Sequence, residues 1–79
     1  MFTAHGRERA WSRAGIRDIQ QLCRMWATAR EATAADFDAF LTWQRPGTEC
    51  RVAVSSRGVF LLVRDVVHDR FVTIIPKRS

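Results

Sequence analysis

The chain has 79 residues, 47% of them hydrophobic and 27% charged, with a net charge of +5 and a pI near 11. This length suits one domain, residues 1–79, and the composition excludes a disordered chain. Cys23 and Cys50 lie far apart in the sequence without a nearby histidine, so we expect no metal, no cofactor, no disulfide and a reducing, cytoplasmic compartment. The longest nearly apolar stretch, 59–67, is interrupted by Arg64 and Asp65 and is too short to cross a bilayer, so no membrane contact is expected.

Positive charge comes almost entirely from arginine, since Lys77 is the single lysine among the 13 cationic residues. Residues 1–30 and 51–79 are basic, whereas residues 31–50 are acidic. Arginine pairs with phosphate and stacks on bases, so this segregation favours contact with RNA. An arginine excess also arises in GC-rich genomes, and this alternative stays open.

Helical signals occupy residues 3–45. The first predicted helix begins after Thr3, an N-cap residue, and ends near Gly15, which can adopt the left-handed conformation. The second covers 17–29, and the third begins at Thr33 with a motif like a capping box and stops before Pro46. The second helix has a predicted buried stripe of Ile16, Ile19, Leu22, Cys23, Trp26 and Ala29, and the third places Phe37, Phe40 and Leu41 on one face.

Three strands are predicted at 50–56, 59–67 and 71–75, within an antiparallel meander covering 49–76. Their turns are expected at 57–58 and 68–69. Because helices precede strands, the fold class is α+β, with N-terminal helices on a three-stranded sheet and a four-stranded sheet as the alternative.

Two-residue turns would place Arg51 opposite Arg64, and Arg64 opposite Thr73. The helices are expected to cover the more apolar sheet face, formed by Val52, Val54, Leu61, Val63, Val72 and Ile74. The opposite face would then present Arg51, Arg64 and Thr73 in one row.

The first predicted helix carries His5, Arg9 and Arg13 on one face. Cleavage of RNA needs a base for the 2′-hydroxyl, cations for the phosphorane and an acid for the leaving oxygen, and histidine with arginine can supply these without metal. A solvated charged face is the alternative interpretation.

Other candidate residues are less specific. His68 stands beside Asp69, which resembles a base with an orienting carboxylate, although both are common turn residues. Trp43 lies off the apolar stripe of the third helix and is the best exposed candidate for stacking on bases. Lys77 and Arg78 form a short basic segment that can attract phosphate.

The segment from Phe2 through His5-Gly6-Arg7-Glu8-Arg9 to Arg13-Ala14-Gly15-Ile16 resembles the opening of the barnase, EndoU, colicin and RelE-like (BECR) superfamily. The segments 51–54, 60–63 and 71–76 resemble its closing strands. This resemblance implies a RelE-like fold and, in active members, a metal-independent endoribonuclease toxin. Small proteins of a phage or mobile element reuse the fold for inhibition and binding. The matched residues are His5 as base or acid, Arg9 and Arg13 as cations for the phosphate charge, and Thr73 as the residue that positions the phosphate. Arg51 and Arg64 come from the register argument and are expected to bind phosphate.

Residues 31–47 depart from that pattern, because an acidic helical segment replaces a shorter connection. Phe37, Phe40 and Trp43 make this segment a candidate surface for an antitoxin, another protein or a second copy of the chain. Two functions are therefore expected: a toxin-type endoribonuclease, or a non-catalytic binding protein for nucleic acid or protein. Convergence of His5, Arg9 and Thr73 on one pocket would favour cleavage, and divergence would favour binding. A transcriptional regulator is a third alternative without a clear recognition helix.

Overall fold

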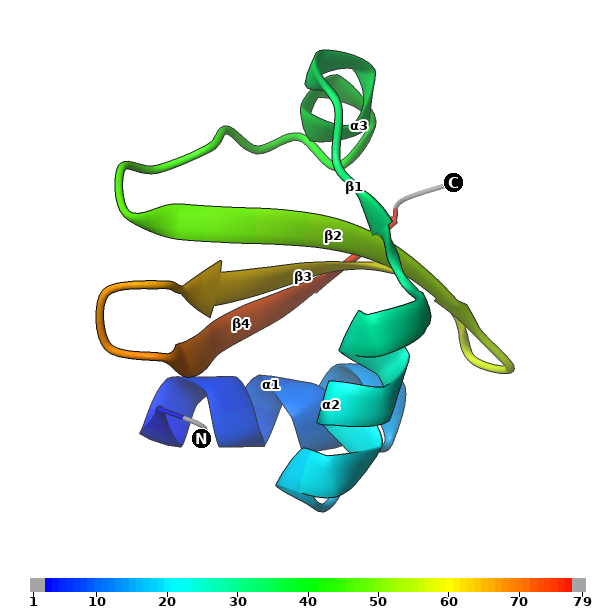
Figure 1. The fold of residues 1–79 in the computed structure, drawn as a ribbon. Coiled ribbons are helices and arrows are strands. Elements are labelled where there is room, and N and C mark those ends of the chain that lie inside the picture. The colour runs from blue at the N-terminus through cyan, green and yellow to red at the C-terminus, as the bar shows by residue number, and fades with distance from the viewer. Residues whose placement is uncertain (1–2, 78–79) are drawn as a thin grey trace.

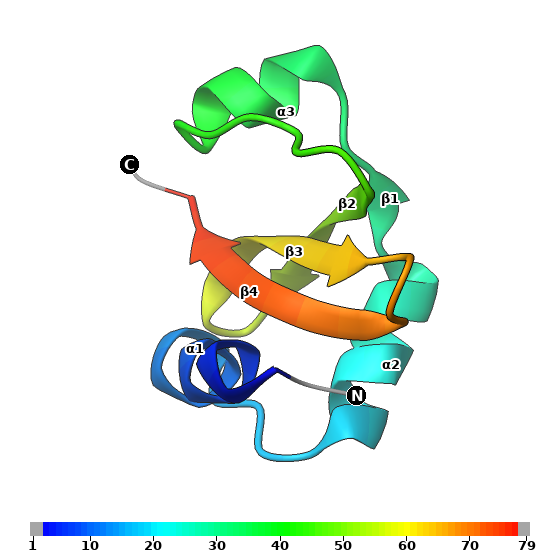
Figure 2. The same cartoon turned by 90° about the vertical axis from the view of Figure 1, so that its left-hand side faces the viewer.

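The computed structural model describes residues 3–77, apart from the side chain of His5. The elements of this part of the chain are α1 (Ala4–Ala14), α2 (Ile19–Thr28), β1 (Arg30–Glu31), α3 (Ala34–Ala39), β2 (Thr48–Ser55), β3 (Gly58–Asp65) and β4 (Arg70–Pro76). The strands form one antiparallel sheet in the order β1-β2-β3-β4. Helices α1 and α2 lie on one side of the sheet and α3 on the other (Figures 1 and 2). The described helices include none long and apolar enough to span a bilayer.

Helix α1 begins and ends where the sequence predicts. The Thr3 hydroxyl accepts a hydrogen bond of 2.8 Å from the Gly6 N–H, and Gly15 adopts φ 69° beyond the last turn. Helix α2 is also close to its predicted bounds, with Asp18 as its N-cap. Its stripe differs at one position, because Cys23 is exposed rather than buried.

Helix α3 is much shorter than predicted. It starts at the expected capping box of Thr33 and Asp36, but it ends at Phe40, well before Pro46. Leu41 follows with φ 56°, a left-handed conformation that cannot continue the helix. Residues 42–47 therefore form an extended loop that returns to the sheet (Figure 1).

A fourth strand, β1, was not among the three predicted strands. Arg30 and Glu31 pair with Val52 and Arg51 of β2, and the Ala32 N–H donates to the Cys50 carbonyl at 3.0 Å. So short a strand has no apolar alternation that a sequence pattern could reveal. The four-stranded alternative is therefore the correct one.

The turn between β2 and β3 falls one residue earlier than predicted. The Ser55 hydroxyl accepts a hydrogen bond of 3.1 Å from the Arg57 N–H, which closes the turn before the expected position. The predicted pairing of Arg51 with Arg64 is wrong, because Arg51 lies opposite Leu62. The shift is two residues along β3, so the side chains stay on the same faces relative to β2.

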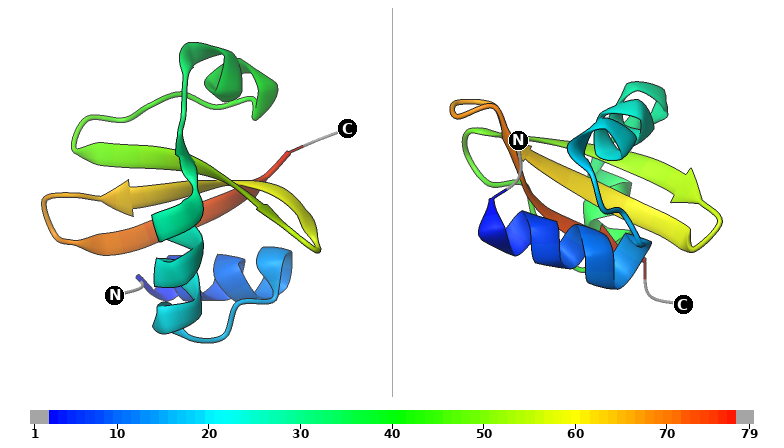
Figure 3. Two further views of the ribbon diagram at one scale, coloured as in Figure 1. Left: turned by 45° about the vertical axis from the view of Figure 1, so that its right-hand side comes forward. Right: turned by 90° about the horizontal axis from the view of Figure 1, so that it is seen from below.

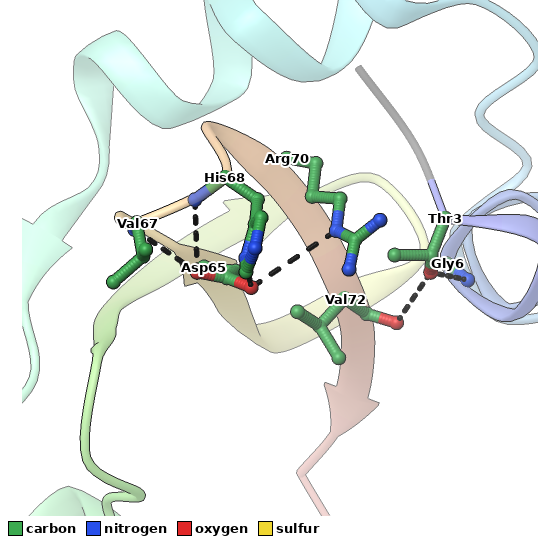
Figure 4. Close-up of polar contacts among 7 residues, drawn as sticks. All are labelled: Thr3, Gly6, Asp65, Val67, His68, Arg70 and Val72. Carbon is green, nitrogen blue, oxygen red and sulfur yellow. Dashed lines mark hydrogen bonds and ion pairs between the residues drawn. The ribbon is translucent and has the colours of Figure 1, made fainter.

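The turn between β3 and β4 is longer than the two residues predicted. Asp65 pairs with Arg70, which leaves residues 66–69 as the turn. One Asp65 carboxylate oxygen accepts hydrogen bonds from the N–H groups of Val67 (3.0 Å) and His68 (3.2 Å) (Figure 4). These bonds start the turn at Asp65.

An irregularity between Val63 and Arg64 changes the pairing further. Arg64 lies opposite Phe71 and Val63 lies opposite Thr73, so the predicted pairing of Arg64 with Thr73 is wrong. The pairing of Val63 with Thr73 differs from the predicted register by one residue, and a shift by an odd number of residues exchanges the two faces of a strand. Ile74 therefore faces α1 and α2, and Thr73 points to the side of α3.

The sheet is covered on both faces, by two separate groups of apolar side chains. The group beneath α1 and α2 contains Ala10, Ala14, Ile16, Leu22, Ala53, Phe60, Leu62, Phe71 and Ile74. The group on the α3 side contains Phe40, Cys50, Val52, Leu61 and Val63. The prediction that the first two helices cover Val52, Leu61 and Val63 is wrong: α1 and α2 cover the opposite face.

Candidate nucleic-acid interface

The Arg13 side chain of α1 reaches the outer edge of β4. The Arg13 Nη1 atom donates a hydrogen bond of 2.7 Å to the Ile74 carbonyl, and half-buried Arg9 lies one turn earlier on the same helix. At the start of the helix, the Thr3 N–H donates to the Phe71 carbonyl, and the Thr3 hydroxyl donates to the Val72 carbonyl (Figure 4). Figure 3 shows α1 running alongside β4. The helix is thus fixed along the edge strand. The side chain of His5 and the whole of Arg78 lie outside the described residues, so those two predictions remain predictions.

Arg51 and Arg64, expected to bind phosphate, are engaged within the protein around Trp26. The Arg51 guanidinium donates to Glu49 and to the Trp26 carbonyl, both at 3.0 Å, and lies 4.4 Å from the centre of the Trp26 ring. Arg64 forms an ion pair with Asp69 and lies 5.9 Å from the same ring. Arg51 also satisfies a carbonyl at the C-terminal end of α2, where cations are favoured. Both arginines therefore have structural roles.

His68 is paired with Asp65 rather than with its neighbour Asp69. The His68 Nδ1 atom lies 2.8 Å from an Asp65 carboxylate oxygen, and the Arg70 Nε atom lies 4.0 Å from the same oxygen (Figure 4). The hydrogen bond from His68 holds the pKa of Asp65 below its usual value, and the turn N–H groups lower it further. The hydrogen bonds of Asp65 hold the hairpin turn closed, and the His68 ring is largely exposed.

Thr73 lines a cavity on the α3 side of the sheet, under the loop 42–47. The cavity measures about 190 Å³, and its walls are Thr42, Trp43, Arg45, Thr48, Cys50, Leu61, Val63, Thr73 and Ile75. No described residue of α1 contributes to it. The structure therefore brings Thr73 together with Trp43, and it separates Thr73 from the arginine row with which it was predicted.

The cavity combines an exposed aromatic ring with buried polar groups. The Trp43 side chain is 65% exposed, and the Arg45 guanidinium lies 5.2 Å from its ring centre. Inside, burial raises the pKa of the Cys50 thiol, so this group is protonated and neutral near pH 7. Of the other residues proposed for partner binding, Phe40 belongs to the core and Phe37 packs against it. Of the three, only Trp43 is largely exposed, and Phe37 is partly buried.

A second exposed tryptophan carries an arginine at the corner between α1 and α2. Trp11 is 48% exposed, and the Arg17 guanidinium lies 4.1 Å from its ring centre. Arg57 reaches the same corner from the turn between β2 and β3, where its guanidinium packs on Gly15. The sequence offered little signal for this surface. Arg17 lies outside the helix that carries Trp11, and only the turn of the chain at Gly15 brings the two side chains together.

Free positive charge concentrates near these two tryptophans. Ion pairs in the described part of the chain occupy Arg30, Arg51, Arg64 and Arg70. Among the described residues, the cations without a carboxylate partner are Arg7, Arg17, Arg24, Arg45, Arg57 and Lys77. Three of these six, Arg17, Arg45 and Arg57, belong to the two tryptophan surfaces. No group of three or more His, Cys, Asp or Glu residues within the described part could hold a metal ion.

An arginine beside an exposed tryptophan is suited to nucleic acid. The ring can stack on a base, and the guanidinium can pair with phosphate or stack in turn. Neither property identifies a family. No protein-family model, curated protein or solved structure matches this chain.

Proposed function

We propose that this protein binds single-stranded RNA without cleaving it. The observation that supports this proposal is that Trp11 and Trp43 are both exposed, and that each has an arginine over its ring with no carboxylate partner among the described residues. Stacking of a base on an aromatic side chain contributes about 1–3 kcal/mol. The net charge of +5 adds attraction to phosphate that depends on salt.

A single strand is the favoured form because stacking on tryptophan requires bases that are free of a duplex. Trp11 lies at the corner of α1 and α2, whereas Trp43 lies in the loop after α3 on the other side of the sheet. One strand that contacts both must pass around the domain. A duplex offers its bases to neither ring.

The endoribonuclease implied by the BECR resemblance is the competing proposal. It requires cations and a hydroxyl around one phosphate. Arg13 is bonded to the Ile74 carbonyl and Arg64 to Asp69, while Thr73 lines the cavity behind the sheet. These engagements favour binding over cleavage, and a cleavage assay decides between the two proposals.

Binding of a short unstructured RNA, followed by fluorescence anisotropy at low salt, tests the first proposal. We expect Trp11→Ala and Trp43→Ala each to weaken binding about five- to a hundredfold, as loss of one stacked base predicts. Val54→Ala is the matched control, because Val54 is apolar and 79% exposed but carries no arginine. Absence of binding by the wild type, or an equal loss in the control, would overturn the proposal.

Incubation of the same RNA with the protein in EDTA tests cleavage. We expect the RNA to stay intact with both the wild type and His5→Ala. Cleavage by the wild type that is lost in His5→Ala would replace the binding proposal with the endoribonuclease.

A further inference from the structure

The cavity beside Trp43 is built differently from the exposed tryptophan surfaces. Its floor is the apolar face of the sheet, formed by Leu61, Val63 and Ile75, and its roof is the loop that carries Trp43 and Arg45. The Thr48 hydroxyl donates a hydrogen bond of 2.6 Å to the Arg45 carbonyl, which ties this loop to β2. The roof is thus fixed to the strand beneath it.

Thr73 places a hydroxyl in the wall of this cavity. The residue is only 9% exposed, and its hydroxyl forms no hydrogen bond with any other described residue. No fully buried side-chain nitrogen or oxygen among the described residues lacks a hydrogen-bond partner, so the Thr73 hydroxyl is open to solvent in the cavity. A ligand that enters the cavity can take the place of that solvent as its partner.

The volume and chemistry of the cavity suit a flat polar ring. About 190 Å³ is the space of roughly six water molecules at about 30 Å³ each. The apolar floor can contact the face of a ring, while Thr42 and Thr73 can donate to or accept from its edge. Arg45 beside Trp43 is the one cation among the lining residues, which suits a phosphate left outside.

We infer that this cavity receives one unpaired nucleobase of the bound RNA, with the Thr73 hydroxyl bonded to the edge of the base. The inference rests on the proposed function, since it concerns the same RNA. Trp43 stacks on the neighbouring base and Arg45 pairs with the linking phosphate. Because a hydroxyl both donates and accepts, Thr73 can serve more than one kind of base.

Thr73→Val is the first variant, because it removes the hydroxyl and keeps the shape of the side chain. We expect RNA affinity to fall about three- to tenfold, the loss for one hydrogen bond. The thermal midpoint of the free protein should stay the same or rise, since the Thr73 hydroxyl forms no hydrogen bond with any other described residue that the substitution would break. Thr28→Val is the matched control, because Thr28 is exposed on α2 and remote from the cavity.

A second measurement follows the base itself. In an RNA in which one base at a time is replaced by the fluorescent analogue 2-aminopurine, one position should be quenched strongly on binding, and less by Thr73→Val. Removal of the base at that position should weaken binding to the wild type more than binding to Thr73→Val, because only the wild type also loses the hydrogen bond. The two losses are then not additive, as expected for two groups that contact each other.

The outcomes separate this inference from the proposed function. If the wild type binds no RNA, the proposed function fails and the inference fails with it. If RNA binds and Trp43→Ala weakens binding, but Thr73→Val binds like the wild type and no single base matters, the cavity inference alone is overturned. A lowered thermal midpoint for Thr73→Val would also count against it, because it would assign the hydroxyl a structural role.

Discussion

The Arg13 guanidinium is hydrogen-bonded to the Ile74 carbonyl across 61 positions of sequence. β4 is an edge strand, so its outward carbonyls would otherwise lack a partner in the sheet. At the other end of α1, the Thr3 N–H donates to the Phe71 carbonyl at 3.0 Å. Helix α1 therefore covers the edge of the sheet along its length.

Replacement of Arg13 should destabilise the protein. We expect Arg13→Ala to lower the free energy of unfolding by about 1–2 kcal/mol, because the Ile74 carbonyl loses its partner. Urea denaturation measures this change. Arg24→Ala, which removes the same charge from an exposed position on α2, should leave the free energy of unfolding nearly unchanged. Equal stability of the two variants would show that the bond to Ile74 contributes nothing.

Gly6 should tolerate no side chain, although it lies inside a helix. Helix propensity alone predicts that Gly6→Ala stabilises α1 by about 1 kcal/mol. A Cβ atom at this position would instead lie 2.6 Å from the Phe71 carbonyl oxygen. We expect a lower thermal midpoint and a loss of about 1–3 kcal/mol, as for overpacking. Ser12→Ala, at an exposed site on the same helix, should be neutral or stabilising, and a stabilised Gly6→Ala would refute the close approach.

Asp36 should contribute to stability in a manner that depends on pH. Two hydrogen bonds from Arg30, at 2.7 and 2.8 Å, hold the Asp36 pKa far below its usual value, and the Thr33 N–H lowers it further. A carboxyl group with a lowered folded-state pKa stabilises the fold above its unfolded-state pKa of about 4, and this contribution is lost as the pH falls towards the folded-state value. Asp36→Asn should therefore be less stable than the wild type at pH 7.

The stability difference between wild type and Asp36→Asn should narrow as the pH falls below about 4, measured by urea denaturation across this range. Asp38→Asn is the control, because Asp38 is exposed on the same helix and forms no ion pair with a described residue. A difference that stays constant with pH would contradict a role for the Asp36 charge.

The two cysteines should differ in reactivity. Cys23 is exposed, whereas Cys50 is buried and burial raises the pKa of its thiol. Because the thiolate is the nucleophile, iodoacetamide should modify Cys23 first in the native protein, and Cys50 far more slowly. Mass spectrometry of the intact protein and its peptides follows both sites. In denaturant both should react, and a Cys50 that reacts as fast as Cys23 without denaturant would place the thiol outside the core.

The features of the fold that depend on local signals could be predicted from the sequence. The features that depend on competing hydrogen bonds could not. Thr3 and Gly15 mark the ends of α1 because capping needs only their own side chains and backbone. The sheet register depends on where each turn starts. Ser55 and Asp65 start the two turns earlier than the predicted positions 57–58 and 68–69, by accepting hydrogen bonds from N–H groups of the turns. The irregularity beside Val63 then moved the β4 side chains from Thr73 onwards to the other face.

The candidate site could also be predicted only in part from the sequence. The sequence predicts an exposed Trp43 off the apolar stripe of a helix, and Trp43 is exposed, but it lies in the loop after α3 rather than on that helix. The engagement of Arg51 could not be predicted, because the Trp26 carbonyl reaches it from α2. Thr73 was picked out for phosphate contact, yet it lies in a cavity because of the bulge beside Val63.

Because α1 packs along β4, the protein cannot complete its fold in the order in which the ribosome synthesises it. The apolar face of α1 and its Arg13 find their partners only once residues 70–76 have been synthesised. Until then α1 can form only transiently, since an isolated helix this short is marginally stable in water. Completion of the fold must therefore wait for the last strand, and a protease that removes this strand would release the helix and expose the core together.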